Sequence, residues 1–134
     1  MKKIALMILS AAAFALAACS RKSDPPDIVT AGDVSARIGY FASHGWDAEE
    51  ISERAVTIPA VFSEAYERYA VMQDRQGLPL RSFAGRDAQL FVYEIKNYSP
   101  KNKRMLAELL VCDGTAAASA VYSEDDTNIL MPVS

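Results

Sequence analysis

RMLAELLVCDGTAAASAVY, residues 104–122, contains the clearest structural signal in the chain. Two apolar, strand-like runs, 104–112 and 115–122, flank the dipeptide Asp113-Gly114. Asp-Gly favours a two-residue hairpin turn, because both of its positions tolerate positive φ. The sequence therefore predicts two adjacent antiparallel strands at this point.

Further strands are predicted on both sides of this hairpin. The run that precedes it is apolar on both faces in its first half, and an earlier run alternates apolar and polar residues before Pro59. Such patterns are typical of short strands bounded by turns. Strands are expected at 51–58, 88–98, 104–112, 115–122 and 129–131.

Two helices are predicted earlier in the chain. The first begins at Thr30, because Thr30-Ala31-Gly32-Asp33 fits a capping box, and it ends at Gly45. The second runs from about 61 to 76 and ends at Gly77, which is followed by Leu78 and Pro79. The first helix is expected to bury one apolar stripe formed by Val34, Ile38, Phe41 and Ala42.

The order helix, strand, helix, antiparallel meander predicts an α+β fold. In this fold two helices pack on one face of a small, mainly antiparallel sheet. The alanine-rich strand 116–120 suits a place where a helix or a neighbouring backbone comes close. The alternative is that this strand lies at a weakly packed edge of the sheet, where small residues accumulate without a packing role. The sequence does not separate the two explanations.

The chain opens with the pattern of a bacterial export signal. Met1-Lys2-Lys3 precedes an apolar run at 4–18 and small residues before a cleavage point, which is typical of a secretory leader. The run closes as Leu16-Ala17-Ala18-Cys19, which resembles the lipobox of bacterial lipoproteins. This resemblance implies cleavage between Ala18 and Cys19 and acylation of the Cys19 thiol by diacylglycerol, with chains such as palmitate.

The leader has two other interpretations. A transmembrane helix needs about 20 apolar residues, and the run 4–18 is shorter than that before Ser20-Arg21-Lys22. An ordinary secretory leader cleaved near Ala18 would leave Cys19 as a plain N-terminal cysteine. With lipid attached, two acyl chains anchor the protein firmly, because each buried methylene contributes about 0.8 kcal/mol.

The rest of the chain is expected to form one domain. Residues 1–18 are the lipoprotein signal peptide, residues 19–29 the lipidated N-terminus with a flexible polar tether, and residues 30–134 a single α+β domain. This organisation predicts a protein on the extracytoplasmic face of the cell membrane, held there by lipid.

Charge argues against nucleic acid as a partner. The formal net charge of the chain is −3, whereas affinity for nucleic acid depends on the neutralisation of phosphates by basic residues. Lys101, Lys103 and Arg104 form a small basic cluster beside a predicted turn. We interpret this cluster as a solvated surface turn.

Candidates for nucleophilic catalysis are few. His44 is the only histidine, and its place in the last turn of the first helix favours a capping role, since the helix dipole favours a cation there. Cys112 is the only cysteine left once Cys19 is acylated, so no intramolecular disulfide is available. Its apolar surroundings in sequence favour a buried, unreactive thiol. No catalytic residue, metal ligand or cofactor is predicted.

Two further groups of residues are candidates for binding. Glu124-Asp125-Asp126 with Asn128 could collect a hard cation, but the spacing lacks the glycine and terminal glutamate of an EF-hand loop, which favours a solvated loop. Aromatic residues could line a groove for a peptide or sugar, or belong to the core with their hydroxyls at its rim. These residues are Trp46, Tyr66, Tyr69, Tyr93 and Tyr98.

Several packing and turn residues between 38 and 113 follow a shared pattern. The pattern has a helix ending in Gly-Trp, a strand ending in Ile-Pro, a helix with spaced tyrosines closed by Gln-x-x-x-Gly, and a tyrosine-bearing strand. Its residues are Gly45-Trp46, Val56-Thr57-Ile58-Pro59, Phe62, Tyr66, Tyr69, Gln73, Gly77, Leu80 and Tyr93. The chain thereby resembles a domain of unknown function found in small exported proteins and lipoproteins of Firmicutes.

The chain departs from this family in two places. Members often have a Gly-Gly-Asp step after the hairpin and a glycine near the C-terminus, where this chain has Ala117-Ala118-Ser119 and Asn128-Ile129. The resemblance therefore carries over no function that depends on the glycine-rich step, and it implies no catalytic residue.

The sequence thus predicts a lipid-anchored, non-catalytic binding or interaction module. Its expected partners are the membrane, through the lipid, and another envelope protein or a cell-wall component. A small envelope hydrolase that uses carboxylates is one alternative. An accessory subunit of a transport or secretion system is another.

Overall fold

A five-stranded antiparallel sheet with strand order β1-β2-β3-β4-β5 organises the computed structural model, which describes residues 28–134. The strands, each within a few residues of its predicted range, are β1 (Ala48–Thr57), β2 (Asp87–Ile95), β3 (Met105–Cys112), β4 (Thr115–Ser123) and β5 (Leu130–Met131). The described helices are α1 (Val34–Ser43), α2 (Glu64–Gln76) and the short 3₁₀ helices η2 (Leu80–Phe83) and η3 (Pro100–Asn102).

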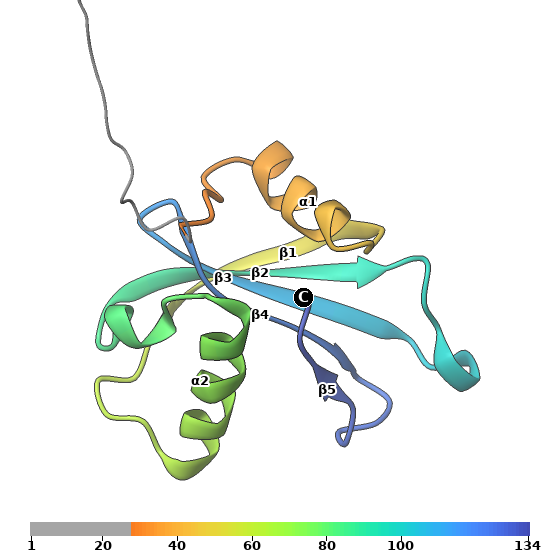
Figure 1. Ribbon diagram of the computed structural model, residues 1–134. Helices are drawn as coiled ribbons and strands as arrows, with labels where there is room; N and C mark the ends of the chain where they lie inside the picture. The colour runs from red at the N-terminus through yellow and green to blue at the C-terminus, as the bar shows by residue number, and fades with distance from the viewer. Residues whose placement is uncertain (1–27) are drawn as a thin grey trace, which may run out of the picture.

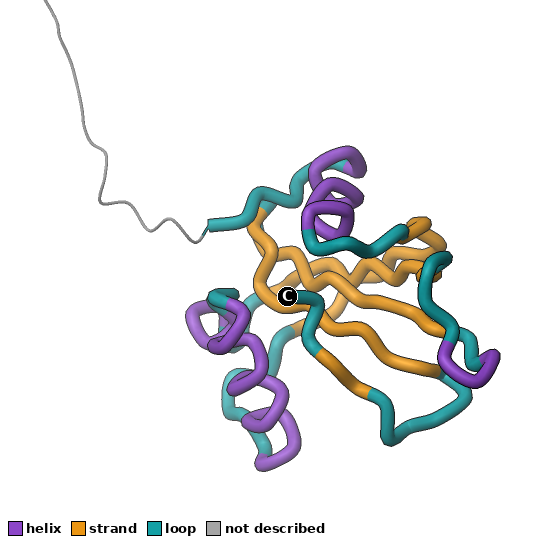
Figure 2. The backbone as a smooth tube through the Cα atoms, turned by 45° about the vertical axis from the view of Figure 1, so that its right-hand side comes forward, coloured by secondary structure: helices purple, strands orange, loops and turns teal. Residues whose placement is uncertain are grey.

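The α+β class is confirmed, with helices packed against an antiparallel sheet. The helices cover opposite faces of the sheet, however, and not one shared face as predicted (Figures 1 and 2). Phe91 and Tyr93 of β2 pack with α1, whereas Leu90 of β2 and Leu110 of β3 pack with α2. Successive side chains of a strand point to opposite faces, so a strand that is apolar on both needs a cover on both. We call these two sides the α1 face and the α2 face.

The predicted hairpin joins β3 to β4. Asp113 and Gly114 have φ angles of 51° and 75°, and a two-residue turn of this kind requires positive φ at both positions. The two strands pair without interruption from the turn except for one register shift between Leu110 and Val111.

Helix α1 begins later than predicted. Asp33, and not Thr30, is its N-cap residue, and the Asp33 carboxylate accepts a hydrogen bond of 2.8 Å from the backbone N–H of Ala36. Thr30 instead forms a β-bridge with Thr115 in the hairpin, so its backbone is already engaged with the sheet. The predicted end is confirmed, because Gly45 follows the last turn with a φ of 87°.

The buried side of α1 also differs from the predicted apolar stripe. Phe41 is fully buried, but Val34 is 52% exposed and Arg37 is buried. Arg37 forms hydrogen bonds of 2.8 and 3.2 Å with the Glu50 carboxylate, and its guanidinium lies 3.8 Å from the centroid of the Phe91 ring. A cationic side chain can occupy such a position because its stem is apolar and its charge is paired.

Helix α2 is defined by a cap at each end. Ser63 caps the start by accepting a 3.1 Å hydrogen bond from the backbone N–H of Tyr66, so the helix begins after the predicted residue 61. At the end Gly77 is left-handed with a φ of 75°, and the N–H of Leu78 donates to the carbonyl of Gln73 at 2.9 Å. This is the predicted glycine stop with its Schellman bond.

The alanine-rich strand β4 is where α2 meets the sheet. Ala117 and Ala118 are fully buried and belong to the cluster that packs with α2. Gln73 and Gln76 of α2 form hydrogen bonds with the backbone of β4 nearby. Small side chains let the helix approach the strand closely, so the first of the two explanations for this composition applies.

The contacts of the domain begin at Val29. Its carbonyl accepts a hydrogen bond from Ala116 N, and Ala31 N donates to the carbonyl of Gly114, each at 2.8 Å. The tether predicted for 19–29 therefore ends before Val29. The signal peptide, Cys19 and the rest of the tether lie outside the described residues. None of the helices within 28–134 combines the length and apolarity needed to cross a membrane.

Candidate binding groove

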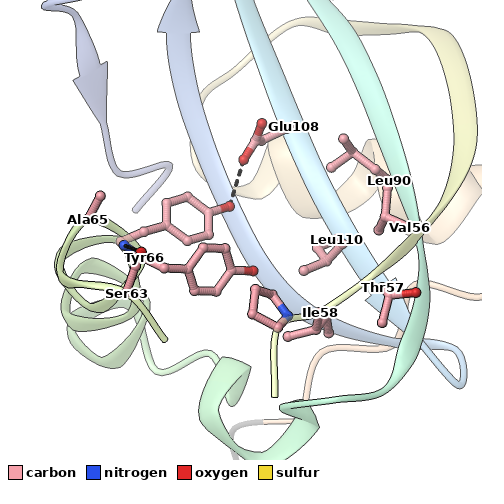
Figure 3. A pocket seen from close by; sticks show the side chains of 11 residues that line it. Val56, Thr57, Ile58, Ser63, Ala65, Tyr66, Leu90, Glu108 and Leu110 are labelled. Carbon is pink, nitrogen blue, oxygen red and sulfur yellow. Dashed lines mark hydrogen bonds between the residues drawn. The ribbon is translucent and has the colours of Figure 1, made fainter. Parts of the chain in front are cut away.

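A groove of about 510 Å³ opens on the α2 face of the sheet. The N-terminal half of α2 forms one wall, the end of β1 and the following residues form the other, and β2 and β3 form the floor (Figure 3). This volume lies in the range of known ligand pockets. The lining is mostly apolar and consists of Val56, Thr57, Ile58, Pro59, Ser63, Ala65, Tyr66, Tyr69, Leu90, Glu108 and Leu110.

Local features of the sequence determine where both walls of the groove begin and end. Pro59 lacks a backbone N–H and cannot continue the ladder of β1, and Ser63 then starts α2. Tyr66 and Tyr69 are three residues apart on this helix, so their side chains lie on the same side of it. That side faces the sheet, and both tyrosines line the groove.

Glu108 is the one carboxylate among the described residues that line the groove. The Tyr69 hydroxyl donates a hydrogen bond of 2.7 Å to its Oε2. The Tyr66 side chain reaches into the groove from α2 (Figure 3), and its ring centroid lies 5.6 Å from that of Tyr69. The groove thus combines an apolar floor with an oriented carboxylate and two tyrosines.

The environment keeps both tyrosine hydroxyls protonated. Burial raises the pKa of Tyr69 well above its ordinary value of 10.0, and the charge and hydrogen bond of Glu108 raise this pKa further. The pKa of Tyr66 is also raised, first by burial and then by the charge of Glu108. Both hydroxyls are therefore neutral donors near neutral pH.

Two of the five aromatic residues considered as groove lining, Tyr66 and Tyr69, meet in this groove. Tyr93 belongs to the core, where it is fully buried against Phe41 with ring centroids 4.6 Å apart. Its hydroxyl donates a hydrogen bond of 2.8 Å to Glu50. Both alternatives weighed for these tyrosines therefore occur in one protein.

Trp46 and Tyr98 form a separate pair, with ring centroids 5.9 Å apart in an edge-to-face arrangement. The Trp46 indole N–H donates a 2.8 Å hydrogen bond to the carbonyl of Val133. Trp46 also packs against the core cluster that contains Phe41, so it lies outside the groove.

His44 and Cys112 do not form a nucleophile–base pair. His44 is exposed at the C-cap of α1, with its ring 5.1 Å from that of Tyr40. Cys112 is buried on the α2 face, and its thiol lies 3.3 Å from the carbonyl oxygen of Asp87. Burial raises the pKa of the Cys112 thiol. The thiol therefore stays protonated. It also lies on the other side of the sheet from α1, which carries His44 at its end.

The acidic loop is tied to the neighbouring basic turn. Glu124 lies 2.6 Å from the guanidinium of Arg104, and Asp125 accepts a 2.9 Å hydrogen bond from the Arg104 N–H. Asp126 lies 3.7 Å from the Lys103 ammonium. Within 28–134 no group of three or more His, Cys, Asp and Glu side chains is arranged to hold a metal ion.

Glu108 is the groove residue that sequence reasoning missed. Its signal was a single charged residue within the otherwise apolar run 105–112. Its hydrogen-bond partner Tyr69 is 39 residues away along the chain, so local spacing does not reveal the pair.

Comparison of the chain with protein-family models, with curated proteins and with solved structures finds no match. The groove and the leader are therefore the basis for the functional conclusions.

Proposed function

We propose that this chain is a non-catalytic binding module of the cell envelope that receives a partner in the groove beside α2. The leader that ends in Leu16-Ala17-Ala18-Cys19 supports a lipid anchor on the extracytoplasmic face of the membrane. We also propose that this chain is related to the family it resembles, the domain of unknown function in small exported proteins and lipoproteins of Firmicutes. The partner is another envelope protein or a cell-wall component. If this chain is an accessory subunit of a transport or secretion system, the groove is where it would bind that system.

The observation that carries the proposal is an open, mostly apolar groove whose polar groups are held in fixed positions. Leu90 and Leu110 form apolar floor, and Tyr69 orients Glu108 within it. Val61, in the loop between β1 and α2, is 86% exposed and lies in the chain between Pro59 and Ser63, which both line the groove. Apolar concave surface with a few placed polar groups is typical of binding sites.

A hydrolase that uses carboxylates receives less support. Most glycosidases place two carboxyl groups within about 10 Å of each other across the bond they cleave. The described lining of the groove has Glu108 alone. The Glu108 carboxylate is bound to a tyrosine whose pKa is raised, and such a pair can hold a ligand but supplies no second acid or base.

Site-specific photo-crosslinking in intact cells tests the proposal. A photoreactive residue replaces Val61 at the rim of the groove in the full chain, and a matched variant carries it at Val34, which is 52% exposed on α1. We expect a crosslinked adduct at 61 and none at 34. Ala65→Trp, which fills the groove from the side of α2, is expected to abolish the adduct.

Three results would contradict the proposal. They are the absence of an adduct at 61, equal adducts at 61 and 34, and an adduct at 61 that survives Ala65→Trp in a variant with an unchanged melting temperature.

A further inference from the structure

We propose that the partner presents a lysine side chain, carried on an extended segment, to Glu108 in this groove. The inference rests on the proposed function and adds the chemistry of recognition, which is an ammonium group on an unbranched apolar stem.

The first argument is the missing counter-ion of Glu108. Three glutamates of the described chain are half-buried, namely Glu50, Glu94 and Glu108. Glu50 lies 2.8 Å from the Nε of Arg37, and Glu94 lies 3.5 Å from the Nε of Arg104. Within 28–134, no Lys, Arg or His nitrogen lies within 4.0 Å of the Glu108 carboxylate. The Glu108 carboxylate thus has the Tyr69 hydroxyl as a partner and no described cation beside it, and a cation on the partner would add a charge-assisted hydrogen bond.

The second argument is the surroundings of the carboxylate. The rings of Tyr66 and Tyr69 lie 5.6 Å apart and are inclined by 49° to each other, and the faces of such rings attract cations. The apolar side chains of Leu90 and Leu110 lie on the floor beside Glu108 (Figure 3). They match the methylene stem of a lysine, which packs along apolar surface while its ammonium binds the acceptor.

The third argument favours lysine over arginine. A guanidinium carries five N–H donors in a fixed plane, whereas an ammonium carries three that rotate freely. Glu108 is the one charged acceptor in the described lining of a mostly apolar groove. An arginine would therefore leave more donors unpaired there than a lysine.

The fourth argument favours a protein segment over a small amine. The groove extends from the first turns of α2 across β3 and β2 to the end of β1. It is therefore wide enough to receive a stretch of backbone together with one side chain. The exposed Val61 beside it provides further apolar contact outside the groove. A small amine uses neither of these surfaces.

Peptide titration of the full chain, held in lipid nanodiscs, tests this inference. The probe is fluorescent acetyl-Ser-Leu-Lys-Leu-Ser-amide, and the readout is fluorescence anisotropy. Its analogues carry acetyl-lysine or arginine in place of lysine. We expect binding of the acetyl-lysine peptide to be about tenfold weaker, because a hydrogen bond to a charged group is lost. The arginine peptide is expected to bind more weakly than the lysine peptide.

Variants assign the effect to the groove. Glu108→Gln is expected to weaken binding of the lysine peptide about tenfold and to leave the acetyl-lysine peptide unchanged. Glu53→Gln is the matched control, because it removes an exposed carboxylate from β1 at a position paired with Phe91 on the α1 face. Tyr66→Leu removes a ring face without changing charge and is expected to weaken the lysine peptide several-fold.

The outcomes that overturn the inference are distinct from those that overturn the proposed function. Equal affinity for the lysine and acetyl-lysine peptides, or equal effects of Glu108→Gln and Glu53→Gln, rejects recognition of an ammonium at Glu108. Competition by hexylamine with the affinity of the peptide rejects the protein segment in favour of a small amine. If no peptide binds, the inference fails, while an adduct at position 61 in cells still supports a partner in the groove.

Discussion

The side-chain oxygen of Gln73 accepts a 2.9 Å hydrogen bond from the backbone N–H of Ser119, which fixes α2 to strand β4. Gln76, one residue before the end-capping glycine, donates a 3.0 Å hydrogen bond to the carbonyl of Ser119. β5 pairs with only Val121 and Tyr122 of this strand, so the two glutamines satisfy backbone groups that β5 does not reach. They set the position of α2 on the sheet and thereby the width of the groove.

We expect Gln73→Leu to lower the free energy of unfolding by about 2 kcal/mol. Gln73 is fully buried, and its loss leaves the buried N–H of Ser119 without an acceptor, which costs about 1–3 kcal/mol. Chemical denaturation measures the change. Glu64→Gln, at an exposed position on the same helix, is the control and should change stability by less than about 0.5 kcal/mol. Equal effects of the two substitutions would contradict the role given to Gln73.

The ion pair of Arg37 with Glu50 makes stability depend on pH. Burial alone would raise the pKa of Glu50, but hydrogen bonds from Arg37 and Tyr93 and the charge of Arg37 outweigh it and lower this pKa below the ordinary 4.5. A lowered pKa means that Glu50 stabilises the fold above 4.5 and loses this contribution as the pH falls from 4.5 through its folded-state pKa.

We therefore expect Glu50→Gln to be less stable than the wild type by about 2 kcal/mol near neutral pH. The difference should shrink below pH 4.5 and then level off. Thermal melts from pH 7 to pH 3 measure it, with Glu53→Gln on the same strand as the control. A difference that stays constant over this range would show that Glu50 acts through packing and not through its charge.

Two glycines in helical surroundings should respond in opposite directions to a side chain. Gly77 has a φ of 75° and no atom within 4 Å of an added Cβ, so strain alone decides its response. Gly77→Val should cost about 1–2 kcal/mol, because a β-branched residue resists the left-handed region. Gly39→Ala, inside α1 with open space around it, should be neutral or stabilising by up to about 1 kcal/mol. Equal melting temperatures for Gly77→Val and the wild type would contradict the helix end described above.

Cys112 should not react with thiol reagents in the folded protein. Its side chain is 1% exposed and burial raises its pKa, so little thiolate is present or accessible. Titration with a chromogenic disulfide measures this directly. Rapid reaction before unfolding would show that β3 opens locally at its end. Added denaturant should expose the thiol at the rate of unfolding.

Cys19→Ala should abolish lipidation and leave the leader uncleaved by the lipoprotein peptidase. The prediction follows from the lipobox-like Leu16-Ala17-Ala18-Cys19 and from the role of two acyl chains in anchoring. Partitioning between detergent and aqueous phases, with mass spectrometry of the N-terminal peptide, provides the measurement. Unchanged partitioning of the variant, or an unmodified thiol on Cys19 in the wild type, would reject the lipid anchor.

The sequence predicted best where a single residue dictates backbone geometry. Asp113 and Gly114 require positive φ for a tight hairpin, and Gly77 requires it for a helix stop, so these boundaries are confirmed. The start of α1 was wrong because Thr30 and Asp33 both suit a cap, and pairing of Thr30 with Thr115 decides between them. Capping preference is local, whereas that pairing depends on the fold.

The placement of α2 and the groove depend on contacts between distant residues. Helical periodicity shows that Tyr66 and Tyr69 share a side of α2, but it does not show which face of the sheet they meet. The apolar residues on both sides of β2, Leu90 and Phe91 among them, already indicated that both faces need a cover. The sequence around Glu108 does not indicate Tyr69 as its hydrogen-bond partner, because this bond forms only when α2 packs over β3.

Amide hydrogen exchange of the full chain shows whether the groove is occupied in the cell. Exchange is measured in membranes of the producing cells, where a partner is present, and again after purification into lipid nanodiscs. We predict slower exchange in the membranes for residues 57–69, which form the loop and the first turns of α2, and unchanged exchange for α1. Equal exchange of residues 57–69 in the two preparations, or slowing confined to α1, would contradict a partner in the groove.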